Sequence, residues 1–150
     1  MKLGEVAAAV GKGLFAGAVG TAAMTLSSTM EMKLRGRPAS SAPADAAAKV
    51  LGVEPKGEKE EARFSTLVHW GYGTSWGAAR GLIGAAGLRG MRAGVAHFSA
   101  VWGTEQVTLP ALGVAPPLWE WGAKEVAIDA FHHLVYASAT SVAYALLDRQ

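Results

Sequence analysis

Apolar residues gather into four stretches along the chain, separated by polar or proline-rich segments. The stretches run from Leu14 to Met32, from Phe64 to Leu88, from Ala93 to Leu112 and from Lys124 to Leu147. Each is close to the ~20 residues with which an α-helix crosses roughly 30 Å of hydrocarbon. The pattern predicts an all-α, polytopic membrane protein: a bundle of four antiparallel transmembrane helices with both termini on one side.

The connections between the stretches complete a single predicted domain of residues 1–150. Residues 33–63 form the longest connection, in which Ser41 favours the start of a short helix and Gly52 its end. The charged run "EPKGEKEEAR" within it is expected to be a solvated loop. The last connection, "LPALGVAPPLWEWG", carries prolines that end a helix and two tryptophans that suit a membrane–water interface.

Composition supports the membrane interpretation and narrows the chemistry. Hydrophobic residues make up 51% of the chain and charged residues 17%, against about a quarter in soluble domains. A soluble protein with buried helices is the alternative. The net charge of +2, without a basic stripe, argues against nucleic acid as a partner. The chain has no cysteine, so a metal site must use oxygen and nitrogen ligands.

Glycines recur at the spacing that lets membrane helices approach closely. The chain has 19 glycines, and Gly73/Gly77 and Gly13/Gly17 are each four residues apart. Small residues at this spacing allow two backbones to touch, and this contact drives helix association in lipid. Gly73 and Gly77 are therefore expected to lie against a neighbouring helix. Such faces also offer a route to a homo-oligomer.

Acidic and imidazole side chains interrupt the apolar stretches at one level. Because consecutive spans alternate in direction, the end of the first span lies at the same membrane surface as the start of the second. The same holds for the second half of the third span and the first half of the fourth. At 1.5 Å per residue, this layer is roughly 15 Å thick. The residues in it are Glu31, His69, Glu105, Glu125, Asp129, His132 and His133.

A charged side chain within a bilayer usually faces the bundle interior and has a partner. Carboxylates and imidazoles together suit Fe, Mn or Zn, and helical bundles can build such sites from Glu and Glu-x-x-His patterns. Asp129 is followed by His132 at i+3 and by His133 at i+4, and the spacing does not choose between them. The cluster is predicted to bind a metal ion or to relay protons. Alternatively, its members only pair with one another or lie among headgroups.

Other polar residues take supporting places in this scheme. Tyr136 shares the helix face of Glu125 and Asp129. Arg80 and His97 fall deeper, as a second and weaker group, in which the isolated His97 is assigned a structural role. His132, Tyr136 and Arg80 are therefore candidates for contacts around the site rather than for its primary ligands.

Three segments resemble the YagU-like family of small bacterial inner-membrane proteins. They are "STMEMKLRGRP", "LVHWGYG" and "LPALGVAPPLWEWGAKEVAIDAFHHLVYA". The resemblance implies a multi-span helical protein of the inner membrane and implies no reaction. Carried over by position, it favours Glu31, His69, Glu125, Asp129 and His133 as site residues. It prefers His133 to His132, and at Glu105 the family has a different polar residue.

Two further functions are compatible with the same residues. His69 and His133 could be the axial ligands of a haem, although three additional carboxylates are more than a haem pocket needs. The polar residues could instead only fix helix packing in a non-catalytic interaction protein. The sequence contains no nucleophile triad, phosphate-binding loop or zinc-protease motif, so no enzymatic reaction is assigned.

Overall fold

Four long helices and one short helix make up the computed structural model, which describes residues 2–149. The helices are α1 (Leu3–Arg35), α2 (Ala42–Leu51), α3 (Glu58–Ala85), α4 (Gly90–Ala111) and α5 (Ala123–Leu147), with a 3-10 turn at Leu118–Glu120. The described residues contain no strand, so the all-α prediction is confirmed.

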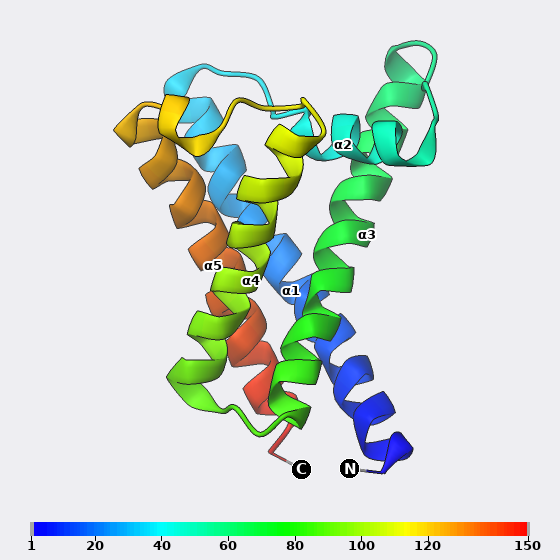
Figure 1. Cartoon of the computed structure of the whole chain (residues 1–150), viewed down its shortest axis with the longest axis vertical. Helices are drawn as coiled ribbons and strands as arrows, with labels where there is room; N and C mark the ends of the chain where they lie inside the picture. Colours follow the sequence, from blue (N-terminus) through cyan, green and yellow to red (C-terminus); the bar gives the residue numbers. More distant parts are fainter. Residues whose placement is uncertain (1, 150) are drawn as a thin grey trace.

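The long helices run along the long axis of the molecule in alternating directions (Figure 1). The start of α1 and the end of α5 lie at one end, together with the turn between α3 and α4. The end of α1, the start of α3, the end of α4 and the start of α5 lie at the opposite end. The short helix α2 lies across this second end, between α3 and α4. The residues predicted to share one level therefore come from helix segments at the same end of the bundle.

The helix boundaries follow the local signals, with one correction. The short helix is present, and Gly52 ends it in the left-handed conformation at φ 64°, as glycine does most readily. The charged run from residue 54 was expected to be a loop, but α3 already begins at Glu58 within it. Glu58, Glu60 and Glu61 occupy the first turn, where acidic side chains stabilise the positive end of the helix dipole.

The closest helix contact is a backbone-to-backbone seam between α1 and α3. A Cβ atom on Gly77 would collide with the carbonyl oxygen of Gly13 and would lie 2.6 Å from the Cα of Gly17. A Cβ atom on Gly73 would collide with the side chain of Thr21. The expectation that Gly73 and Gly77 face a neighbouring helix is confirmed, and the helix that they contact is α1 of the same chain.

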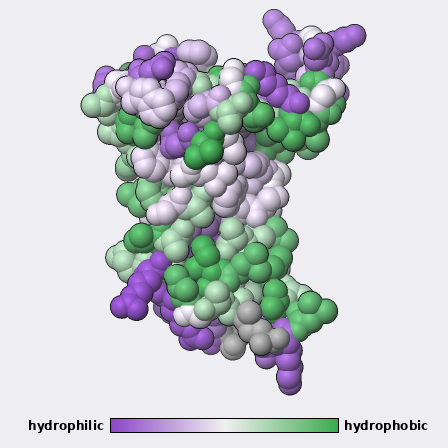
Figure 2. All heavy atoms as spheres, in the orientation of Figure 1, coloured by the Kyte–Doolittle hydropathy of each residue, from purple (hydrophilic) through white to green (hydrophobic). Residues whose placement is uncertain are grey.

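Many large apolar side chains point outward, and the buried side chains include several that are small or polar. Phe15, Leu67, Val107 and Phe131, one from each long helix, are 65%, 72%, 69% and 55% exposed. The buried set contains four alanines together with Thr21, Arg80, His97, His132 and Thr140. Figure 2 shows hydrophilic residues gathered at the two ends of the molecule and an apolar to neutral surface between them.

By length and composition, α1 is the one helix of the described chain that is apolar enough to cross a membrane. Within the apolar stretches of α3 and α4, charged, imidazole and amide side chains lower the hydropathy. His69 and Arg80 in α3 and Glu105 and Gln106 in α4 are examples.

Candidate functional site

Three of the predicted residues come together between α4 and α5. Glu105, Asp129 and His133 each offer a ligand atom, and the three atoms lie within 4.8 Å of one another. The Nε2 atom of His133 is 2.8 Å from a carboxylate oxygen of Glu105, and its Nδ1 atom is 3.6 Å from Oδ1 of Asp129. We call these three residues the Glu–Asp–His cluster. Its atoms could hold a metal ion.

The protonation of the cluster is constrained by its hydrogen bonds. The main-chain carbonyl of Asp129 lies 2.9 Å from Nδ1 of His133, and a carbonyl can only accept, so Nδ1 carries a proton. The Nε2 atom nevertheless faces a carboxylate at 2.8 Å. Two lone pairs at this distance repel unless a cation separates them. The pair between His133 and Glu105 therefore needs either a second proton or a metal ion.

The Asp129 side chain is oriented by a residue that the sequence did not single out. The indole Nε1 of Trp102 donates a 2.7 Å hydrogen bond to Oδ2 of Asp129, which leaves Oδ1 directed at His133. Trp102 is held in turn by stacking on Phe98, with ring centroids 5.6 Å apart. The sequence feature that could have pointed to Trp102 is its spacing. Trp102 precedes Glu105 by three residues and so lies on the same face of α4.

His69 lies outside the cluster but faces the same cavity. A cavity of about 280 Å³ opens between the helices, and His69, Glu105 and His133 all line it. The Nε2 atom of His69 is 2.8 Å from the hydroxyl of Thr25, whose own proton is donated to the carbonyl of Thr21 at 2.7 Å. The imidazole therefore donates to Thr25. For both His69 and His133, Nε2 is already engaged by a protein side chain.

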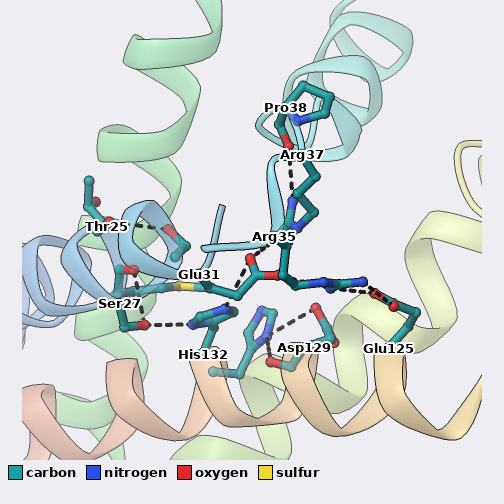
Figure 3. Close-up of polar contacts among 12 residues, drawn as sticks. Thr25, Ser27, Glu31, Arg35, Arg37, Pro38, Glu125, Asp129 and His132 are labelled. Carbon is teal, nitrogen blue, oxygen red and sulfur yellow. Dashed lines mark hydrogen bonds and ion pairs between the residues drawn. The ribbon is translucent and has the colours of Figure 1, made fainter. Parts of the chain in front are cut away.

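Glu31 and Glu125 belong to a separate ion-pair network at the end of the bundle (Figure 3). Arg35 donates to Glu31 at 2.9 Å and to Glu125 at 3.0 Å. Arg37 donates to Glu31 through Nε at 2.9 Å and also through Nη2. We call these four residues the surface network. Each of the two carboxylates is already neutralised by arginine, and the structure does not bring either of them into the Glu–Asp–His cluster.

The adjacent histidines take different roles. His132 is buried, with its Nδ1 atom 2.6 Å from the hydroxyl of Ser27 and its Nε2 atom 3.8 Å from Glu31. It thus packs α5 against α1 beneath the surface network, as Figure 3 shows. His133 points the other way, to Glu105 on α4. The geometry distinguishes the two residues where spacing alone did not.

The deeper polar residues hold helices together away from the cluster. Arg80 is only 3% exposed; it donates to the hydroxyl of Ser141 at 3.2 Å and lies 4.5 Å from the centre of the Tyr144 ring. This cation–π contact gives the guanidinium a favourable environment without a carboxylate.

His97 and Tyr136 each bind a main-chain carbonyl of α3. His97 is fully buried, and its Nε2 atom donates to the carbonyl of Trp76 at 3.0 Å, in keeping with a structural role. The hydroxyl of Tyr136 donates to the carbonyl of Gly73 at 2.5 Å. Tyr136 also lines the cavity, so of the supporting candidates it lies nearest to the space beside the cluster.

No family model, curated protein or solved structure matches this chain. The resemblance to the YagU-like family remains a prediction from the quoted segments.

Proposed function

We propose that this chain is a multi-pass membrane protein in which α1, α3, α4 and α5 all cross the bilayer. The resemblance to the YagU-like family points to the bacterial inner membrane. The supporting observation is the reversed distribution of side chains: Phe15, Leu67, Val107 and Phe131 face outward on the four helices, while Arg80 and His97 are buried. A water-soluble bundle would instead bury its large apolar residues.

The modest hydropathy of three helices is compatible with this arrangement. Polar residues such as His97 in α4 and Thr140 in α5 face the interior, where they meet protein rather than lipid. Purification tests the proposal directly. The protein should need detergent to stay in solution, and a detergent-free monomer on gel filtration would overturn the membrane assignment.

We further propose that the Glu–Asp–His cluster binds a divalent metal ion, with Fe, Mn and Zn as the candidates. The observation that carries this is the 2.8 Å separation of the His133 and Glu105 ligand atoms. Two ligands bound at ~2.1 Å and about a right angle to each other are ~3.0 Å apart. The pair is therefore already spaced for adjacent coordination positions, and Asp129, fixed by Trp102, supplies the third ligand.

The test is metal analysis of protein purified in mild detergent, followed by titration of chelator-treated protein with each ion. His133→Ala should weaken binding by at least 100-fold. His69→Ala is the matched control, because it also removes an imidazole from the cavity wall, and it should change affinity by only a few-fold. An absence of binding in the parent protein would overturn the metal proposal. So would a visible haem spectrum that disappears in both variants, which would favour a bis-histidine haem.

A further inference from the structure

The cavity beside the cluster is larger and more apolar than a metal ion requires. Its volume of about 280 Å³ lies just below the roughly 300–1,000 Å³ of typical ligand pockets. Its walls come from all five helices and are mainly aliphatic and aromatic. Representative lining residues are Met24, Val68, Trp76, Val101, Leu109 and Leu112. A space of this kind suits the body of a small organic molecule rather than a hydrated ion.

The charges around the cavity favour a cation. Glu105 is the one carboxylate among the lining residues, and the lining includes no lysine or arginine. Asp129 does not line the cavity, but its Oδ1 atom lies 3.6 Å from Nδ1 of His133. Even with the imidazole protonated, two carboxylates face one positive charge, so the polar end of the cavity is negative. An anionic ligand would be repelled there.

Aromatic rings complete the complementarity. Tyr72, Trp76 and Tyr136 line the cavity, and the faces of aromatic rings attract organic cations. One side is closed by α2, whose residues Pro43 and Ala47 also line the cavity. Because α2 buries none of its own residues, it can be altered without removing part of the protein core.

We propose that the cavity binds a small lipophilic cation, an amine or quaternary ammonium with an apolar body. Its charged end lies beside Glu105, and its apolar part packs against Trp76, Val101 and Leu109. The inference depends on the shape and charge of the cavity and does not require the metal site. Since both ligands use Glu105, a metal ion and the organic cation should compete.

The experiment uses full-length, chelator-treated protein in detergent, with benzyltrimethylammonium as the probe and calorimetry as the readout. Phenylacetate, an aromatic anion of similar size, is the ligand control. The cation should bind measurably, and phenylacetate at least tenfold more weakly. Equal binding of both, or no binding of the cation, would overturn the proposal.

Two variants locate the binding site. Glu105→Gln should weaken the cation at least tenfold, whereas Glu120→Gln, an exposed acid at the same end of the molecule, should bind as the parent does. Ala47→Phe, which fills the cavity from α2 and leaves Glu105 in place, should also weaken binding at least tenfold. Ala47→Phe tests whether the cation occupies the cavity even if Glu105→Gln fails to fold. Unchanged cation binding in Ala47→Phe would overturn the proposal. If the parent protein binds the organic cation but no metal ion, only the metal proposal is rejected.

Discussion

The contacts that α3 makes with α1 and with α4 are built in opposite ways. Against α1 it places Gly77 and Gly81, so that main chain meets main chain over the most extensive helix contact of the described structure. Against α4 its contact is far smaller, and the space between them contributes to the cavity. Figure 1 shows α1 and α3 crossing closely, with α2 bridging from α3 towards α4.

The difference shows how the fold separates stability from chemistry. In lipid, helices gain little from burying apolar surface against each other, so close packing of small residues must supply the contact. In the proposed membrane setting, the seam of α1 and α3 meets this need, and it leaves no room for a Cβ atom at Gly77 or Gly81. The α4–α5 side carries larger polar side chains, among them Glu105 and His133, which line the cavity.

The largest effect is expected from Gly77→Leu, which breaks the seam. A side chain there must displace the main chain of Gly13 and Gly17, and overpacking of this kind typically costs about 1–3 kcal/mol and occasionally more. The variant should fail to give a folded, monodisperse species in detergent. Gly71→Leu is the control on the same helix, because a Cβ atom there meets open space, and it should fold like the parent. Equal stability of both variants would contradict the close packing of Gly77 against α1.

The seam was largely predictable from the sequence, because glycine spacing directly reports where backbones can meet. Gly73 and Gly77 were expected to face another helix, and they do. Their partner could not be predicted, since the spacing says nothing about which helix lies opposite. The start of α3 was misjudged for a similar reason. Charge predicted exposure correctly, but the exposed run from Glu58 is also a favourable helix start.

Second in size is Trp102→Phe, which removes the hydrogen bond to Asp129 while keeping an aromatic ring. Loss of a residue that orients a metal ligand typically costs 10–100-fold in affinity. Metal titration of the variant should show a loss in this range, with little change in thermal stability. Trp119→Phe is the control, since Trp119 is 83% exposed and lies outside the cluster. An unchanged affinity in Trp102→Phe would contradict the role of the indole.

The candidate site was only partly predictable. The sequence predicts how far along its helix a residue lies more readily than it predicts which partner the side chain contacts. Alternating spans placed Glu31 and Glu125 at the same end as Asp129, and both do lie at that end, near the end of α1 and in the first turn of α5. The structure pairs them instead with Arg35 and Arg37. These arginines belong to the end of the first span and its connection, and their long side chains reach back to the acids. Side-chain reach of this kind cannot be derived from spacing.

A smaller effect is expected from Tyr136→Phe, which removes a polar link across the cavity side. The hydroxyl of Tyr136 donates to the carbonyl of Gly73 and so joins α5 to α3. Loss of one such hydrogen bond should lower the free energy of unfolding by ~1 kcal/mol. Tyr72→Phe, at a residue that is 49% exposed, should have less effect on stability. Denaturation in mixed detergent measures both, and equal losses would contradict the link.

The smallest global effect is expected from Lys49→Met, which loosens α2 over the cavity. Lys49 donates from Nζ to the carbonyl oxygens of Leu112 at 2.7 Å and Gly113 at 3.3 Å, and so ties α2 to the end of α4. The bond is exposed, so global stability should change by less than ~0.5 kcal/mol. Because α2 buries no residue, however, its local opening depends on such contacts. Amide exchange across Ala42–Leu51 should accelerate about fivefold, equivalent to ~1 kcal/mol.

Lys56→Met, in the exposed connection that follows, should leave this exchange unchanged. If α2 exchanges at the parent rate in Lys49→Met, its contacts with α3 alone hold it over the cavity, and the Lys49 hydrogen bonds to the end of α4 do not contribute.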